Sequence, residues 1–182
     1  DHVDSSNLDS LVPQIVKFCR DNAHVGGEIR VIPGAELTHL PPPLIGKLAR
    51  KAREKGAKLV MVHGETIVEP VPKGTNTAAL DADINILAHP GLISEEEVKM
   101  ARKREIYLEI SSRKGHSLTN GWLARLATKW GAKLILSTDT HDAEDLITEE
   151  AATKVLQGAG LSHREIESVV RNSRELLEKM SL

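Results

Sequence analysis

Histidines and carboxylates stand at recurring points of this sequence, each directly after a short apolar segment. Imidazole and carboxylate groups are ligands that Zn, Mn and Fe ions take in proteins. A lone histidine after a strand is more often a structural hydrogen bonder, but a set that recurs after successive apolar segments indicates a metal site. The candidate ligands are His2, Glu36, His63, His89, Asp139 and His141.

The elements that must position these groups alternate between short apolar runs and helical patterns. Short strands separated by helices of about 10–15 residues are typical of parallel β-α units. Strands are expected over residues 28–35, 58–62, 85–88, 106–110 and 134–136, and a sixth is expected to end at Asp1-His2.

Helix boundaries are marked by prolines, glycines and capping residues. The signals are Leu8 and Gly26-Gly27 for the first helix, Pro41-Pro42-Pro43 with a buried face of Leu44, Leu48 and Ala52 for the second, residues 77–82 for the third, Ser94 with Glu97 for the fourth, residues 123–130 with Gly131 for the fifth, and Thr148 and Ser162 for the last two.

In a parallel barrel the carboxyl ends of all strands meet at one rim, where active sites are built. The candidate ligands are therefore expected to converge there and to hold more than one ion. Glu109 interrupts the apolar residues of its strand, so it either points into the barrel or pairs with a lysine or arginine. Glu65 is a candidate for orienting a ligand histidine, whereas His24 and His163 are expected at the surface.

A basic segment, Arg113-Lys114-Gly115, is the best candidate for binding an anion. A guanidinium can grip a phosphate with two parallel hydrogen bonds, and glycine lets the backbone approach. The alternative is a solvated basic loop. His116 follows in the same polar loop and is a candidate substrate contact.

The composition narrows the class of protein. The 182 residues suffice for one domain, and 40% hydrophobic with 27% charged residues is ordinary for a soluble globular chain. The net charge of −2 favours neither nucleic acid nor an anionic membrane, and 2% aromatic residues leave few stacking platforms for single strands. No apolar run reaches the roughly 18 residues of a membrane span. The single cysteine, Cys19, allows no internal disulfide, so the cytoplasm is the expected compartment.

In chain order the motifs read Asp-His, Gly-x-Glu, Val-His-Gly-Glu, Ala-His-Pro-Gly, Glu-Ile-Ser-Ser-Arg-Lys-Gly-His and Ser-Thr-Asp-Thr-His. This order, from His2 to about Leu146, resembles the polymerase and histidinol phosphatase (PHP) superfamily. It looks closest to the stand-alone PHP proteins related to histidinol phosphatase.

The resemblance implies an α/β fold, a distorted seven-stranded TIM-like barrel with two or three divalent ions (Zn, Mn or Fe). By motif, the ligand roles fall on the six candidates named above, and Glu36 resembles the carboxylate that bridges two ions. The family opens with a His-x-His motif on its first strand, which this chain does not contain. Residues 1–182 are therefore expected to form a single PHP-type barrel domain whose first β-α unit lies upstream.

The expected function is hydrolysis of a small phosphate monoester, similar to histidinol phosphate, by a metal-activated hydroxide. Arg113 would neutralise charge on the phosphoryl oxygens, and Asp139 or His141 would move a proton to the leaving alkoxide. A small phosphorylated substrate is thus the expected partner, rather than a membrane or a nucleic acid.

Two alternatives stay open. An amidohydrolase-type barrel that cleaves C–N bonds also places histidine and aspartate at strand ends. A degenerate barrel that serves as a binding subunit, as in the similar barrel among ribonuclease P proteins, would have lost its ligands and gained a basic surface.

Overall fold

The computed structural model describes residues 1–23 and 29–180, which form an α/β fold around one parallel sheet. Its six strands lie side by side in chain order, and every neighbouring pair is parallel. The strands are β1 (His2–Val3), β2 (Gly34–Leu37), β3 (Leu59–His63), β4 (Ile86–Ala88), β5 (Tyr107–Ser111) and β6 (Leu134–Ser137).

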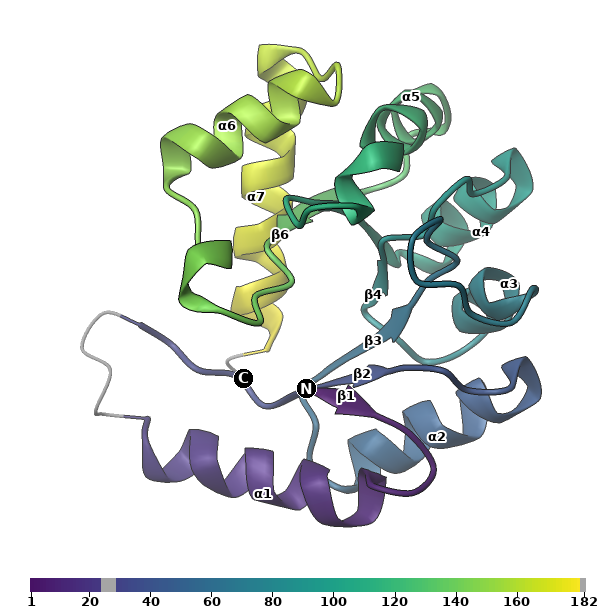
Figure 1. Ribbon diagram of the computed structural model, residues 1–182, viewed down its shortest axis with the longest axis vertical. Coiled ribbons are helices and arrows are strands. Elements are labelled where there is room, and N and C mark those ends of the chain that lie inside the picture. Colours follow the sequence, from purple (N-terminus) through teal and green to yellow (C-terminus); the bar gives the residue numbers. More distant parts are fainter. Residues whose placement is uncertain (24–28, 181–182) are drawn as a thin grey trace.

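Helices follow the strands and cover the outside of the curved sheet, with β1 and β6 at its two edges (Figure 1). The helices are α1 (Leu8–Asp21), α2 (Pro42–Glu54), α3 (Thr75–Leu80), α4 (Glu95–Arg104), α5 (Asn120–Trp130), α6 (Glu149–Gly158) and α7 (His163–Lys179), with short 3₁₀ turns η1 (His116–Thr119) and η2 (Ala143–Asp145).

The sheet forms the centre of the hydrophobic core because its strands are covered by side chains on both faces. All five residues of β5 are buried, as are all three of β4. Parallel strands covered on both sides are built from continuous runs of valine, isoleucine and leucine, which is the pattern of these segments. Two carboxylates interrupt these runs while still buried, namely Glu36 in β2 and Glu109 in β5.

Capping residues set the helix ends largely where the sequence predicts them. The Ser94 hydroxyl accepts from the Glu97 backbone N–H while the Glu97 carboxylate accepts from Ser94, so the predicted capping box at α4 is confirmed. Gly131 ends α5 with a φ of 68°, a left-handed conformation that suits glycine. Thr148 and Ser162 stand at the N-caps of α6 and α7, as predicted.

Two local predictions are wrong. β2 begins at Gly34, so Val31 and Ile32 lie outside the sheet; Pro33 brings no N–H to a ladder, and its carbonyl accepts from Lys58 and Leu59, the latter at the start of β3. Leu44 is exposed rather than buried, because the phase of α2 turns other residues inward. The buried residues of α2 are Ile45, Leu48, Ala49 and Ala52.

Some predictions fall outside the described residues, namely the helix stop at Gly26-Gly27, the surface position of His24 and the start of a strand at Glu28. The number and order of the strands agree with the prediction, including the one at His2, although β2 covers Gly34–Leu37 rather than residues 28–35. The sheet is open, since β1 and β6 stand at opposite ends of the strand order within the described chain. That residues 1–182 form one incomplete barrel domain stays a prediction.

Among the described helices, none combines the length and apolarity that crossing a membrane requires.

Candidate metal centre

The candidate ligands lie where their strands end. His63 is the last residue of β3, and His89 follows β4 directly. Asp139 and His141 come after β6, while His2 lies on β1 next to Glu36 on β2, its register partner. Because the strands are parallel, their carboxyl ends lie at the same end of the sheet. Every predicted ligand is therefore found at or near that end.

Three buried histidines form one group, here called the histidine trio: His63, His89 and His116. One ring nitrogen from each lies within 4.8 Å of the others. The His89 ring stacks on His116 with centroids 4.1 Å apart and meets His63 edge-on at 4.4 Å. Burial and the neighbouring His89 charge lower the pKa of His63 to about 4, so this ring is neutral and free to ligate near neutral pH.

A second group, here called the outer group, joins His2, Asp139 and His141. Its ligand atoms also lie within 4.8 Å of one another, and the His2 and His141 rings are 5.4 Å apart. This group is more open than the trio, since the side chains of His2 and His141 are both 43% exposed. Burial, together with the nearby His141, lowers the pKa of His2.

Glu36 links the two groups. Its Oε2 lies 3.6 Å from His2 Nε2, and its Oε1 lies 3.5 Å from His89 Nε2. Burial, against the attraction of His89, raises the pKa of Glu36 to about 7. Glu36 Oε1 and His89 Nε2 are buried polar atoms without a hydrogen-bond partner in the described chain. Such orphaned atoms are costly unless something binds them, and a cation between a carboxylate and an imidazole would satisfy both.

His89 is held from behind by Glu109, a carboxylate buried to 1% exposure on β5. The His89 backbone N–H donates to Glu109 Oε2 at 2.6 Å and the His89 Nδ1 lies 2.8 Å from the same atom, while the Ser137 hydroxyl donates to Oε1. Burial alone would raise the pKa of Glu109, but these bonds and the His89 charge hold it below its usual value. Glu109 thus keeps Nδ1–H as the donor and leaves Nε2 facing the site.

Two candidate ligands and one neighbouring histidine have a strained backbone. His89 has a φ of 27° and Asp139 a φ of 47°, and His39, whose ring stacks at 5.8 Å from His63, has a φ of 53°. Residues with side chains rarely adopt positive φ, and such strain collects at functional sites where the surroundings enforce it. The positive φ angles therefore indicate that the backbone of these turns is held in the conformation that directs the side chains into the site.

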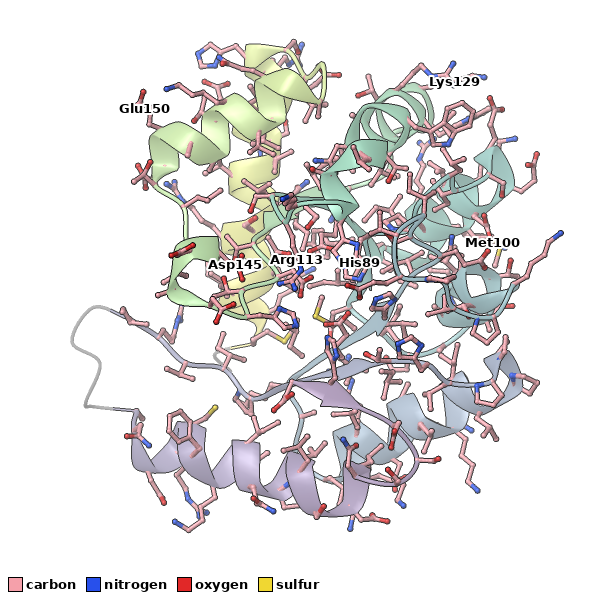
Figure 2. All side chains as sticks on the ribbon, in the orientation of Figure 1. His89, Met100, Arg113, Lys129, Asp145 and Glu150 are labelled. Atoms are coloured by element: carbon pink, nitrogen blue, oxygen red, sulfur yellow. The ribbon has the colours of Figure 1, made fainter. Side chains whose placement is uncertain are left out.

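The two cations of the predicted anion-binding segment lie in different surroundings. Arg113 points at the outer group: its Nε lies 3.3 Å from Asp139 Oδ2, and its Nη1 lies 2.6 Å from His141 Nδ1 and 3.4 Å from Asp145 Oδ2. Figure 2 shows Arg113, Asp145 and His89 in the central region between the helices. Lys114 is exposed. Arg113 is therefore already paired with the carboxylates of Asp139 and Asp145. The sequence did not predict these ion pairs.

His116 was predicted to contact substrate, and the structure places its ring beside the candidate metal ligands. Its ring is buried, stacked on His89, and its Nε2 lies 3.5 Å from Asp139 Oδ2. His163 is exposed on α7, as predicted. Sequence reasoning missed Thr66 and Glu69, which lie next to the trio, because the loop that carries them has no strand or helix pattern.

These donors fit a divalent ion of borderline softness. Neutral imidazoles with one or two carboxylates suit Zn, Mn or Fe better than Ca or Mg, which prefer oxygen alone. The buried trio, the outer group and the linking Glu36 offer places for two ions. A metal centre is thus what the arrangement can support chemically.

Comparison with known proteins shows the family of the chain. No known family model matches it. It is 44% identical over 182 residues, 99% of the chain, to the uncharacterized protein MJ1295 of Methanocaldococcus jannaschii, of which it covers 84%. The chain belongs to the MJ1295 family.

Two solved structures share the fold. A chain of an archaeal ribonuclease P, seen by cryo-EM with mature tRNA, superposes with a TM-score of 0.75 and 14% identity, over 95% of this chain and 78% of that one. An amidohydrolase crystal structure superposes with a TM-score of 0.59 and 14% identity, over 93% of this chain and 47% of the amidohydrolase. The MJ1295-family chain thus has a fold that is found both in an enzyme and in a ribonucleoprotein.

Proposed function

We propose that this protein is a metal-dependent hydrolase whose substrate is a small phosphate monoester. The observation that carries the proposal is the linked ligand set, in which Glu36 stands between His2 of the outer group and His89 of the trio. Two buried atoms that have no hydrogen-bond partner within the described residues, Glu36 Oε1 and His89 Nε2, lie 3.5 Å apart. A degenerate binding barrel would have no reason to keep such a costly pair.

A divalent ion, when bound, supplies a Lewis acid that makes water a nucleophile near neutral pH and polarises the bond to be cleaved. The chain's own residues hold and orient the reactants. Glu109 fixes the ring of His89, and Arg113 fixes the Asp139 carboxylate. In the proposal His141, half-exposed at the rim, moves a proton to the leaving oxygen.

The choice of a phosphate ester rests on the order of the sequence motifs and on the two cations at the rim. Arg113 lies beside the outer group, and Lys114 next to it is exposed. A phosphoryl group would take over some of the guanidinium contacts that Asp145 now makes. As part of this proposal the chain is a PHP-type protein, and its sheet supplies six strands of a seven-stranded barrel.

The fold shared with an amidohydrolase supports a second candidate, hydrolysis of a C–N bond at the same centre. The two candidates use the same ligands and differ in the group beside the ions. A carbonyl substrate needs no cation for its oxygens beyond the metal, whereas a phosphate dianion does. Arg113 therefore distinguishes them.

The test is a reconstitution assay. The chain, freed of metal by chelation, is loaded with Zn²⁺, Mn²⁺ or Fe²⁺, its metal content is measured, and it is offered p-nitrophenyl phosphate, histidinol phosphate and a panel of amides and cyclic imides. We expect metal-dependent release of phosphate that Asp139→Asn abolishes and Glu150→Gln, on the exposed face of α6, leaves unchanged. Turnover of amides alone would favour the second candidate, and a chain that binds no metal would refute both.

A further inference from the structure

One loop of the chain lies over the histidine trio and is fixed at its base by hydrogen bonds. This segment, residues 64–74, is here called the 64–74 loop. The Glu65 carboxylate accepts from the backbone N–H groups of Gly74 at 2.9 Å and Asn76 at 3.0 Å. In return the Asn76 side chain accepts from the Glu65 N–H at 3.0 Å and donates to the Pro90 carbonyl at 2.9 Å. Glu65, which the sequence suggested as a partner of a ligand histidine, instead closes this loop.

Two glycines let the loop approach the turn after β4. A Cβ on Gly64 would lie 2.4 Å from the Ala88 carbonyl oxygen, and one on Gly91 would lie 1.9 Å from the Glu65 carbonyl oxygen. Neither position has room for a side chain. The backbone of the loop is therefore packed against the residues that carry His89, and its position over the trio is set by this contact.

Two side chains of the loop reach the trio. The buried Thr66 hydroxyl lies 2.9 Å from His116 Nδ1. Glu69 Oε2 lies 3.4 Å from His63 Nε2 and 3.9 Å from His116 Nε2. The Glu69 side chain is 49% exposed, so it approaches the trio from the solvent side.

We propose that Glu69 is a carboxylate ligand of the ion held by the histidine trio, and that Thr66 positions His116 for it; this inference rests on the proposed metal centre. Ligand atoms about 2.0–2.2 Å from a tetrahedral Zn²⁺ lie roughly 3.4 Å from one another. The distances from Glu69 Oε2 to His63 Nε2 and to His116 Nε2, 3.4 and 3.9 Å, are close to that separation between ligand atoms. Glu69 thus lies within reach of a further ligand position beside the three histidines.

Charge supports the same assignment. Three neutral imidazoles and the linking Glu36 carboxylate leave one charge of a divalent ion uncompensated in a buried site, and a second carboxylate removes it. Thr66 determines which nitrogen of His116 can ligate, because a proton on Nδ1 that is donated to the hydroxyl leaves the lone pair of Nε2 facing Glu69. Metal binding by the trio therefore depends on the 64–74 loop, from which sequence reasoning expected no ligand.

The test uses Co²⁺ as the probe, since its visible absorption reports the number and geometry of its ligands whereas Zn²⁺ has none. The metal-free chain is titrated with Co²⁺ by absorption and by calorimetry, and His63→Ala and Asp139→Asn assign the signals to the trio and the outer group. We expect Glu69→Gln to weaken binding at the trio by more than about 100-fold, since loss of an outer partner alone costs about 10–100-fold. It should also change the cobalt spectrum while the outer group binds as before.

Two further variants separate ligation from folding. Glu69→Asp keeps the charge but withdraws the carboxylate, and should lose most of the affinity that Glu69→Gln loses. Thr66→Val keeps the shape and should weaken the trio about 10–100-fold. Glu96→Gln, an exposed carboxylate on α4, is the matched control and should change nothing. Normal cobalt binding and spectrum in Glu69→Gln would overturn this inference alone, whereas a chain that binds no cobalt would overturn the metal centre and this inference together.

Discussion

Replacing Glu109 tests whether the centre depends on the buried carboxylate behind it. Glu109 is 1% exposed and accepts from the His89 backbone, the His89 ring and the Ser137 hydroxyl. Glu109→Ala removes all three acceptor contacts and leaves a buried imidazole without its partner. Breaking a buried charged pair in this way costs about 3–5 kcal/mol. At roughly 2–4 °C per kcal/mol for a chain of this size, the expected fall in Tm is about 6–20 °C.

Glu109→Gln changes the charge with little change of shape. The amide oxygen can still accept from His89, and the amide N–H can donate to the Ser137 hydroxyl, so the fold should survive. The loss of negative charge behind His89 makes its Nε2 a weaker donor to a cation, and outer partners of this kind contribute about 10–100-fold to metal affinity. We therefore expect Glu109→Gln to bind Zn²⁺ about 10–100-fold more weakly at the trio.

The assay is differential scanning calorimetry of the metal-free variants, followed by Zn²⁺ titration against a competing chelator. Glu150→Gln is the control, because its carboxylate is 79% exposed and pairs with Lys154 on the same helix face. Its Tm and zinc affinity should match those of the parent chain, as surface changes usually do. The reasoning is refuted if Glu109→Ala has the same Tm as the parent chain, or if Glu109→Gln binds Zn²⁺ with the same affinity as the parent chain.

Three further outcomes are expected. Because the pKa of Glu36 is raised from 4.5 to about 7, the folded chain binds that proton more tightly than the unfolded one. The stability this supplies is present below pH 4.5 and is lost as the pH rises through about 7. Urea titrations of the metal-free chain should therefore show this loss, about 3 kcal/mol, and Glu36→Gln should flatten it. Zn²⁺ at about 100 times its Kd should raise stability by about 2.7 kcal/mol, reversed by a chelator, and an unchanged Tm would argue against a site. Gly91→Ala should destabilise the chain clearly more than Gly74→Ala, since both have positive φ but only Gly91 faces a backbone atom at 1.9 Å; equal Tm values would show that the loop contact is unimportant.

The sequence by itself determined most of the architecture and the composition of the site. Valine, isoleucine and leucine runs separated by capped helices are typical of parallel β-α units, in which the strands pair their backbones and bury their side chains on both faces. The positions after those runs then fall at the carboxyl ends of the strands, which is why the six candidate ligands lie close together. His2, Glu36 and His89 lie within contact distances that register alone makes plausible.

Only the tertiary structure decided the partners of these groups. Glu109 has the same sequence signal whether it meets a lysine or a histidine, and packing between β4 and β5 selects His89. His116, Thr66 and Glu69 lie in loops without periodicity, so their approach to the trio depends on contacts between segments about 50 residues apart. Arg113 meets Asp139 for the same reason. Periodicity encodes which face a side chain takes within its own element, whereas a loop side chain is placed by the surfaces that close around it.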